Sequence, residues 1–593
     1  GEISGILRDI KDRFFHDQID VNGFRLSSSK PGATIACDAI SEYVTELEEN
    51  LFYDFARVEA EFLGKLRDGE LDRFREGLRF VLVDEYQDTN LLQELIYAEL
   101  ATAAIQNGGG ATIVGDDDQS LYRFRGATVD LFEAFPTRFA AVLGSTPRTI
   151  YLSRNYRSTP HIVDFVNDFV QMDNAYQGGR VPGKPRLAVA RTTAYANDPI
   201  FGMFRNDVNE LSHDLADFVH AIVHSTYSFS VGESRYRIRM NPQGGSPADL
   251  ALLMSSPREL DSQGRPRLAL LLRQELQNRH PPINVFNPRG QNLENIPEVQ
   301  RLCGLLLECI DPGATVQGNT SLPPAATSIF NIWRHEAQDY ARRNPQPRTP
   351  IDLGSFVTSW QIRTPLGRSL RGRREVLLTD LIYKLITWVP EMQDDIEGLV
   401  YLEAITRTVT QTSLFASFGG EIIFNPRDPG SRTEQSSVRD ALWNIFTPLA
   451  TGAIEINEDL LETLPSDRLN IMSIHQAKGL EFPLVIVDVG SDFRTEHWAH
   501  AFKRFPRDGG VPHTQEDMLR PFSPLGPPTR SARDRAFDDL VRQFFVAYSR
   551  AQDVLLLVGL NSVRDGIKNV GAGWDRSGTW HWGSGLPNLV PIP

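Results

Sequence analysis

The sequence predicts a mixed α/β protein in which mostly helical segments are inserted between strands of parallel sheets. Short apolar runs that do not alternate with polar residues, such as Phe80–Val83, are typical of strands buried on both faces of such a sheet. Stretches that mix apolar and charged residues at helical spacing, such as Tyr43–Leu66, occur outside these runs. At 593 residues the chain is long enough for roughly three or four domains.

Composition and charge narrow the class of protein. The chain is 41% hydrophobic and 23% charged, which is ordinary for a soluble globular protein. Its net charge of −15 argues weakly against a general nucleic-acid coat protein, although a local basic groove is compatible with it. Cys37, Cys303 and Cys309 form no C-x-x-C pair, so we expect neither disulfides nor a zinc site. With no apolar run of ~18 residues and no secretory signal, we expect a cytoplasmic protein without a membrane partner.

The first part of the chain predicts helices but no phosphate-binding loop. Residues 1–75 have helical spacing, interrupted at Pro31-Gly32. A phosphate-binding loop requires Gly-x-x-x-x-Gly-Lys-Ser/Thr between a strand and a helix, so that successive N–H groups cradle the phosphates. Ser27–Thr34 has these residue types in the wrong order, and Gly108–Gly110 has no lysine. We expect both segments to be plain loops.

Two carboxylates follow the first predicted strand directly. Asp84 and Glu85 come after Phe80–Val83, at the carboxyl end of a strand, where ligands bind in open α/β sheets. One carboxylate in such a pair can hold Mg²⁺, and its neighbour can orient and deprotonate a water molecule. The alternative interpretation is a solvated acidic turn after a core strand.

Further strand-and-loop strings follow along the chain. A second buried strand is predicted at Ala111–Val114, ahead of a loop with three carboxylates, a glutamine, two aromatic residues and two arginines. A third strand is predicted at Thr149–Leu152, and a strand at Leu484–Val489 follows another polar string. In the segment Phe537–Ala551, the spacing predicts that Arg542 and Arg550 share one helical face. Further helices are expected at Leu91–Ile105, Leu211–His224, Leu268–Leu276 and Leu377–Val389, and further strands at Asp249–Met254 and Val554–Val558, with an irregular tail from Asn561.

Five of these strings together resemble motifs II to VI of superfamily 1A DNA helicases of the UvrD/Rep/PcrA type. They occur in the family's order, as Phe80–Asn90, Gly115–Ala127, Ser153–Ser158, Asn470–Phe482 and Phe537–Ala551. The resemblance implies two RecA-like P-loop NTPase-type motor domains with mostly helical insertion subdomains. The first motor domain is expected to be incomplete, because motif I, with its phosphate-binding lysine, and motif Ia are absent from the sequence.

The resemblance also implies roles for individual residues and the cofactors ATP and Mg²⁺. It assigns catalysis to Asp84, Glu85, Gln119, Arg157 and Arg550, with Asp84 and Glu85 at the metal. Nucleotide binding is assigned to Tyr156, Arg157, Gly479, Glu481 and Arg550, and DNA binding to Tyr122, Phe124, Arg125, Ser473 and His475. Outside this context, Phe124 is equally explained as a core aromatic, Arg157 as a surface cation and His475 as a structural histidine.

The same resemblance suggests a division into domains. We expect a helical subdomain at residues 1–78, the C-terminal part of the first motor domain at 79–200, the second motor domain at 201–310 and 468–562, a mostly helical insertion at 311–467 and an irregular tail at 563–593.

The leading hypothesis is an ATP-dependent 3′→5′ helicase and translocase on single-stranded DNA and single/double-strand junctions. The chain begins at Gly1 rather than Met, and we expect an N-terminally truncated product that alone is inactive, because the residues that face ATP downstream are all present. The alternative is a non-hydrolysing module that binds DNA or a protein partner. A helicase-nuclease is less favoured, because only about 40 residues follow motif VI, fewer than a typical domain.

Overall fold

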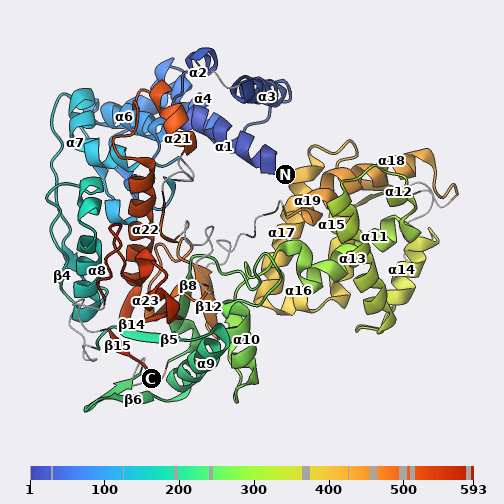
Figure 1. The fold of residues 1–593 in the computed structure, drawn as a ribbon. Coiled ribbons are helices and arrows are strands. Elements are labelled where there is room, and N and C mark those ends of the chain that lie inside the picture. The colour runs from blue at the N-terminus through green and yellow to red at the C-terminus, as the bar shows by residue number, and fades with distance from the viewer. Residues whose placement is uncertain are drawn as a thin grey trace. The chain divides into compact units, whose positions relative to one another are not determined.

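The computed structural model divides into two compact units, each described by itself below. Unit 1 comprises residues 1–256, 278–281 and 472–593, and unit 2 comprises residues 257–277 and 282–471. The structure describes residues 2–27, 31–123, 126–191, 198–239, 245–363, 374–424, 427–452, 454, 456, 464–492, 504–507, 514–582 and 589–593. The predicted DNA-binding residues Phe124 and Arg125 lie outside these ranges. The predicted mixed α/β class is confirmed (Figure 1).

The first segment of unit 1 is helical, as predicted. Asp54 caps one of these helices, because its side chain accepts a hydrogen bond from the Arg57 N–H. Pro31 opens another helix, so the loop predicted over Ser27–Thr34 is wrong for its second half. The helices are α1 (Glu2–His16), α2 (Val21–Ser27), α3 (Pro31–Glu49), α4 (Phe55–Arg67) and α5 (Asp72–Gly77).

The strands that precede motifs II and III pair with each other in parallel. They are β1 (Phe80–Val83) and β2 (Gly110–Ile113), and α6 (Leu91–Gln106) connects them. The prediction that both strands are buried on two faces is wrong, because Phe80 is 73% exposed and Leu82 79% exposed. The physical reason is that Phe80 and Leu82 share one face of β1, and no element within the described chain covers that face.

The strand predicted at Thr149–Leu152 is also wrong. These residues form no ladder, and Ile150 and Leu152 are exposed. A nearby ladder joins β3 (Arg154–Asn155) to β4 (Ala188–Val189) in parallel. Apolar side chains alone therefore did not make a strand here, since a strand also requires a neighbour for its backbone groups.

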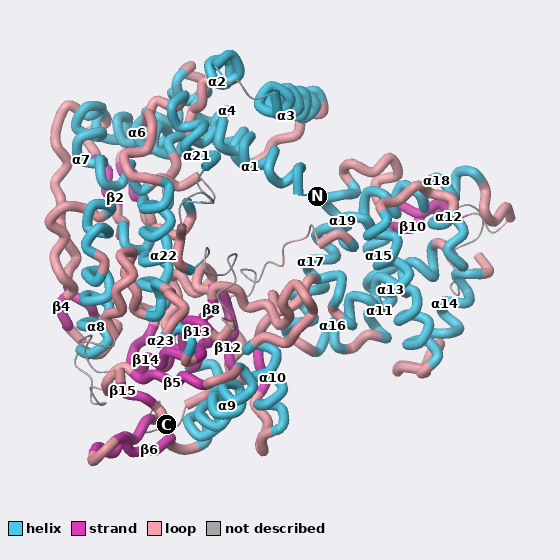
Figure 2. The backbone as a smooth tube through the Cα atoms, viewed as in Figure 1, coloured by secondary structure: helices cyan, strands magenta, loops and turns pink. Residues whose placement is uncertain are grey.

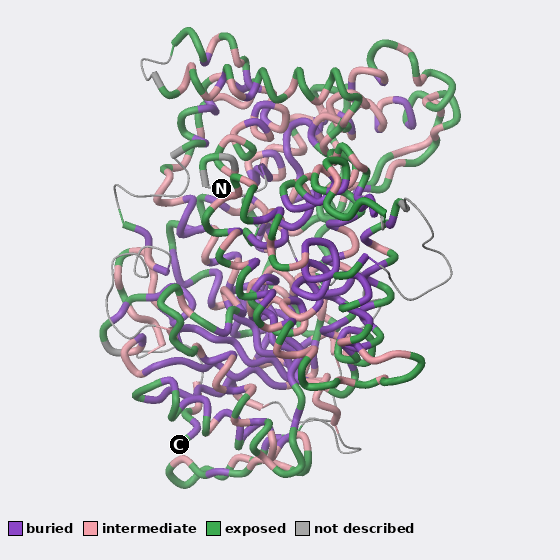
Figure 3. The backbone as a smooth tube through the Cα atoms, turned by 90° about the vertical axis from the view of Figure 1, so that its right-hand side faces the viewer, coloured by how far each residue is buried: buried purple, intermediate pink, exposed green. Residues whose placement is uncertain are grey.

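A seven-stranded sheet carries most of the other predicted strands. Its order is β15-β5-β14-β13-β8-β12-β9, and its observed registers are parallel. All residues of β5 and β8 are buried, which agrees with the continuous apolar sequence of β8 and, except for the terminal Arg205, of β5. Buried stretches of chain are purple in Figure 3. The strands are β5 (Phe201–Arg205), β8 (Leu250–Met254), β9 (Asn284–Phe286), β12 (Arg468–Ser473), β13 (Phe482–Gly490), β14 (Ala551–Leu560) and β15 (Val590–Pro591).

Helices and a hairpin complete unit 1. The predicted helices at Leu91–Ile105 and Leu211–His224 are confirmed as α6 and α9. The predicted shared helical face of Arg542 and Arg550 is wrong, because α22 ends at Tyr548 and Arg550 lies in the turn before β14. The tail is not wholly irregular, since it contributes α23 and β15. The remaining elements are α7 (Val129–Leu143), α8 (Pro160–Met172), α9 (Val208–His224), β6 (Tyr227–Val231), β7 (Ser234–Ile238), α21 (Thr514–Leu519), α22 (Ala532–Tyr548) and α23 (Ser562–Asp565).

Unit 2 is mostly helical, as predicted for residues 311–467 (Figure 2). Its core surrounds the buried side chain of Trp333, whose ring N–H donates to the Glu294 carbonyl at 2.9 Å. Besides β9 and most of β12, unit 2 contains one antiparallel pair among its described residues, β10 (Arg374–Leu377) with β11 (Glu421–Phe424). The helices are α10 (Leu268–Asn278), α11 (Pro297–Ile310), α12 (Thr315–Gly318), α13 (Pro324–Arg342), α14 (Leu353–Gln361), α15 (Leu378–Leu385), α16 (Glu391–Asp394), α17 (Ile396–Ser413), α18 (Arg432–Ala441) and α19 (Thr447–Ala450).

Candidate nucleotide and DNA site

The carboxylates of motif II lie at the carboxyl end of β1. Asp84 Oδ1 accepts a hydrogen bond from the Glu85 N–H at 2.8 Å, and both residues are exposed. Glu85 has a φ of 52°, in the left-handed region that few non-glycine residues adopt. Its Oε2 accepts a hydrogen bond from the Gln87 side chain. The turn therefore presents two carboxylates to solvent from a defined backbone.

Gln87 also connects motif II to motif III. Its Oε1 accepts the Asp116 N–H at 2.8 Å, and its carbonyl accepts the Ser120 hydroxyl at 3.0 Å. Asp116 Oδ2 in turn accepts the side-chain amide of Gln119 at 2.7 Å. These hydrogen bonds fix Gln119 relative to the end of β1.

Gln119 meets the arginine at the end of motif VI. One terminal nitrogen of Arg550 lies 3.3 Å from Gln119 Oε1 and 2.9 Å from the Ser549 hydroxyl, while Nε donates to the Val546 carbonyl at 3.0 Å. Arg550 is 2% exposed. Burial, helped by the neighbouring cation of Arg157, lowers the pKa of Arg550 to about 10. The charged form of Arg550 is therefore destabilised, and an anion placed beside it would stabilise it.

Arg157 joins motif IV to motif V. Its Nε lies 2.5 Å from Glu481 Oε2, and a terminal nitrogen donates to the Ser549 carbonyl at 3.3 Å. Gln552 donates to the other Glu481 oxygen at 2.8 Å. The hydrogen bond from Arg157 lowers the pKa of Glu481. Tyr156 precedes this group of contacts, and its side chain is 69% exposed.

The motif V loop reaches back to motif II. Ser473 and Gln476 exchange hydrogen bonds, with the Ser473 N–H donating to Gln476 Oε1 at 2.7 Å. The loop then turns at Gly479, whose φ of 84° suits glycine. Lys478 Nζ lies 3.0 Å from Glu85 Oε2 and also forms an ion pair with Asp88.

Two predicted DNA-binding rings lie beside this lysine. The Lys478 Nζ is 5.3 Å from the centroid of the Tyr122 ring, a distance that allows a cation–π interaction. The Tyr122 and His475 ring centroids are 6.3 Å apart. The structure thus brings Glu85, Tyr122 and His475 around Lys478, and it separately brings Gln119, Arg157, Glu481 and Arg550 together.

The three consecutive aspartates of motif III surround another lysine. Lys184 Nζ pairs with Asp116, and lies 2.6 Å from Asp117 and 2.7 Å from Asp118. Arg180 also pairs with Asp118, at 2.6 Å. Burial alone would raise the pKa of Asp118, but the two cations outweigh it and lower that pKa. The trio has the spacing of a metal site, yet the Lys184 ammonium occupies the position that a cation would take.

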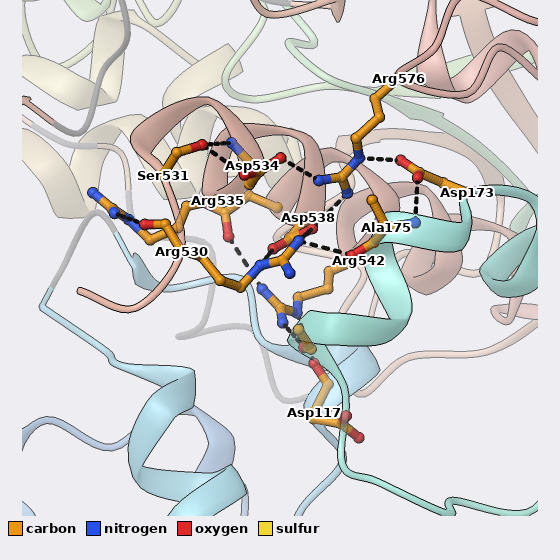
Figure 4. Close-up of polar contacts among 12 residues, drawn as sticks. Asp117, Asp173, Ala175, Arg530, Ser531, Asp534, Arg535, Asp538, Arg542 and Arg576 are labelled. Atoms are coloured by element: carbon orange, nitrogen blue, oxygen red, sulfur yellow. Dashed lines mark hydrogen bonds and ion pairs between the residues drawn. The ribbon is translucent and has the colours of Figure 1, made fainter.

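An ion-pair network holds α22 against the motif III loop (Figure 4). Arg542 Nε donates to the Asp117 carbonyl at 3.0 Å, and a terminal nitrogen donates to the Gly179 carbonyl at 2.6 Å. Arg576, from the tail, pairs with Asp173 at 2.6 Å and with Asp538 on α22 at 2.7 Å. Because α22 leads directly into Arg550, this network also constrains the arginine that contacts Gln119.

The residues present fit part of a Mg²⁺–ATP site. Mg²⁺ is usually held by one or two carboxylates together with waters and substrate phosphates, and the exposed Asp84 and Glu85 supply that donor set. Gln119, Arg157 and Arg550 supply an amide and two guanidinium groups for a terminal phosphate. The amide cradle for the other phosphates has no counterpart in the sequence, which contains no Gly-x-x-x-x-Gly-Lys-Ser/Thr string.

The sequence did not indicate three residues whose importance comes from contacts with distant parts of the chain. Lys478 and Gln87 belong to the motif strings, but nothing local indicates that one contacts Glu85 and the other joins two motifs. Arg576 lies in the tail, where no motif marks it.

Comparison with known proteins identifies the family. Residues 2–140 match the UvrD/REP helicase N-terminal domain, and residues 427–562 match the UvrD-like helicase C-terminal domain. The chain belongs to the UvrD-like helicase family. The predicted resemblance is thereby confirmed, and family membership and the parallel sheet are consistent with two RecA-like motor domains.

Relatives within the UvrD-like family are helicases by name. The chain is 38% identical over 452 residues to ATP-dependent DNA helicase UvrD1 of Mycobacterium tuberculosis, a match that covers 72% of the chain and 51% of the relative. It is 26% identical over 428 residues to DNA helicase II of Salmonella typhimurium, covering 70% and 51%. It is 24% identical over 563 residues to the exonuclease/helicase protein RexA of Streptococcus pneumoniae, covering 88% and 42%. The chain therefore spans about half the length of these relatives or less.

Within the described residues, no helix combines the length and apolar character that crossing a membrane requires.

Proposed function

We propose that the protein is the motor of an ATP-dependent 3′→5′ DNA helicase that moves along single-stranded DNA and opens single/double-strand junctions. The observation that carries the proposal is the meeting of Gln119, Arg157 and Arg550 from three separate motifs. One amide and two guanidinium groups close together suit a γ-phosphate.

The proposed chemistry is ATP hydrolysis. Asp84 would hold Mg²⁺, which supplies charge neutralisation for the phosphates when bound. Glu85 accepts the proton of the attacking water. Arg157 and Arg550 stabilise the charge that develops on the transferred phosphoryl group, a contribution of about 10³–10⁵ in rate in comparable NTPases. Tyr156, Gly479 and Glu481 would face the adenine and ribose side of the nucleotide, as the family resemblance implies.

The proposed DNA path crosses the motif III and motif V loops. Tyr122 and His475 lie together there, and Ser473 anchors the same loop. Phe124 and Arg125 join them on sequence grounds. Stacking of bases on aromatic rings suits a translocase, because every base offers a π face.

We further propose that the phosphate-binding loop belongs to a segment outside this sequence that packs on β1. The exposed side chains of Phe80 and Leu82 on β1 support this, because strands beside a parallel-sheet ATP site are ordinarily covered on both faces. The 593-residue chain alone would then hydrolyse ATP negligibly. The domain division given above, from residues 1–78 to 563–593, stays part of this proposal.

The polarity test uses duplexes with a single-stranded tail of either 3′ or 5′ polarity and the complete natural protein. We expect ATP-dependent strand separation only with the 3′ tail. Opening of only the 5′-tailed duplex would overturn the polarity, and no opening of either with intact DNA binding would overturn the helicase assignment.

A second candidate is a non-hydrolysing module that binds DNA or a protein. The missing phosphate-loop string favours it. The coding sequence upstream of Gly1 discriminates between the two: Gly-x-x-x-x-Gly-Lys-Thr there supports the motor, and a stop codon just upstream supports the module. In either case we assign the protein to the cytoplasm, because all three cysteines are free and buried.

A further inference from the structure

Lys478 is a nearly buried cation that faces two carboxylates and one aromatic ring. Its side chain is 7% exposed, and its Nζ lies 3.0 Å from Glu85 Oε2, beside Asp88 and under the Tyr122 ring. Asp88 is 16% exposed, whereas Glu85 is 53% exposed. The two partners therefore differ: Asp88 is an inner anchor, and Glu85 is an outer side chain that can leave.

We propose that Lys478 is a positioning residue that holds Glu85 in an unproductive ion pair until DNA occupies the Tyr122–His475 surface. The proposal rests on the proposed function, since it concerns the residue assigned as the base for ATP hydrolysis. It adds a switch: DNA binding releases Glu85 by moving the loop that carries Lys478.

The ion pair opposes catalysis by occupying one of the two Glu85 oxygens that can accept a proton. Glu85 Oε2 faces the Lys478 ammonium and also accepts from Gln87. A carboxylate oxygen that already accepts from an ammonium and an amide has less lone-pair capacity left for a water molecule. A general base must also lie within hydrogen-bond reach of the water it deprotonates. Breaking the Lys478–Glu85 pair leaves Oε2 with the Gln87 amide alone, so this oxygen can also accept from that water.

Release of Glu85 leaves the buried ammonium with a partner. Removal of a sole partner from a buried charge is costly, but Asp88 retains Lys478 when Glu85 departs. Asp88 and Glu85 share the single charge of Lys478, because the ammonium contacts both carboxylates.

The turn that carries the His475 ring also carries Lys478. The backbone N–H of Lys478 donates to the His475 carbonyl at 3.3 Å, and the backbone N–H of Ala477 donates to the Ser473 carbonyl at 3.2 Å. The residues from Ser473 to Lys478 thus form one compact turn. A base stacked on Tyr122, or a phosphate drawn to His475, displaces that turn and with it the Lys478 ammonium.

The experiment compares variants of the complete natural protein by ATP hydrolysis with and without single-stranded DNA. Lys478→Met keeps the length and removes the charge. We expect its DNA-free kcat to rise on the order of tenfold, its KM for ATP to stay unchanged, and its stimulation by DNA to shrink accordingly. Lys478→Arg, which keeps the charge, should restore a low DNA-free rate. Lys65→Met, at an exposed ion pair on α4, is the matched control and should behave as wild type.

Asp88→Asn supplies a second test in the opposite direction. It removes the competing carboxylate, so Lys478 should hold Glu85 more firmly, lowering the DNA-free rate and raising the DNA concentration needed for half-maximal stimulation. A purely structural Lys478 would give parallel losses in both variants, with and without DNA, and that result overturns the inference. If Lys478→Met does not fold, an unchanged DNA requirement in Asp88→Asn overturns it.

The two levels of proposal fail differently. A complete protein that shows no DNA-stimulated hydrolysis overturns the proposed function and this inference together. DNA-stimulated hydrolysis whose stimulation ratio is the same in wild type and Lys478→Met overturns the inference alone.

Discussion

Glu85 occupies a left-handed backbone conformation that costs a non-glycine residue on the order of 1–2 kcal/mol. Neighbouring hydrogen bonds maintain it, because the Asp88 N–H donates to the Glu85 carbonyl and the Tyr86 N–H donates to the Val114 carbonyl, both at 3.0 Å. Strain that is maintained in this way is typical of functional sites. The backbone geometry of Glu85 therefore supports the proposal that its carboxylate has a functional role.

Glu85→Gln in the complete protein should abolish ATP hydrolysis and spare nucleotide binding. The amide keeps the shape of the side chain and removes its ability to accept a proton. Turnover measurements and calorimetric titration with ATP check the two halves of this prediction, with the exposed Glu76→Gln as control. Hydrolysis at an undiminished rate would show that another group is the base.

Glu133→Gln should stabilise the protein at pH 8 more than at pH 4. Burial raises the pKa of Glu133, on α7, to about 7. Below its unfolded pKa of about 4.5 both states bind the proton, so the raised pKa takes away no stability. As pH rises towards 7, the unfolded state ionises first, so wild type loses stability that the amide variant retains. Thermal unfolding at both pH values measures this, with the exposed Glu42→Gln as control, and an equal shift at both pH values would contradict the prediction.

Helix packing in unit 2 depends on one glycine. A Cβ added at Gly304 on α11 would lie 2.0 Å from the Trp333 carbonyl oxygen and 2.7 Å from the Ala337 Cβ on α13. The two helices therefore approach each other through backbone contact. At the scale of elements, this close approach matters more than helix propensity.

Gly304→Ala should destabilise unit 2 by about 1–3 kcal/mol, because overpacking outweighs the ~1 kcal/mol gain in helix propensity. Denaturant unfolding measures the free energy of unfolding. Gly318→Ala on α12 is the control, because its added methyl meets nothing within 4 Å. Equal stability of the two variants would mean that α11 and α13 can separate at no cost.

The whole molecule combines most of the residues that we propose for γ-phosphate binding with a first strand that is exposed on one face. Gln119, Arg157 and Arg550 are assembled, while Phe80 and Leu82 of β1 remain in solvent. Such an arrangement would keep the proposed DNA-binding surface but lack the loop that binds the other phosphates of ATP.

Residues 1–593 alone should therefore hydrolyse ATP negligibly and still bind single-stranded DNA weakly. Because binding would use phosphate contacts, the logarithm of the affinity should fall linearly with the logarithm of salt concentration, by about 0.7 per phosphate contacted. Phe124→Ala should weaken this binding through lost stacking of about 1–3 kcal/mol per base. Fluorescence anisotropy and an ATPase assay measure both, and robust DNA-stimulated hydrolysis by this chain would reveal a phosphate site that the motif strings do not contain.

The sequence by itself determined the family and most helices and strands, because apolar periodicity and motif strings are local properties. It placed Asp84 and Glu85 after β1 correctly, and it identified α6, α9 and β13 near their observed ends. Tertiary structure alone decided that β1 is exposed, that Arg550 lies beyond α22 and that Lys478 pairs with Glu85. Burial depends on which layers cover a strand, and an ion pair depends on where two distant loops meet. Neither quantity is encoded in the spacing of nearby residues.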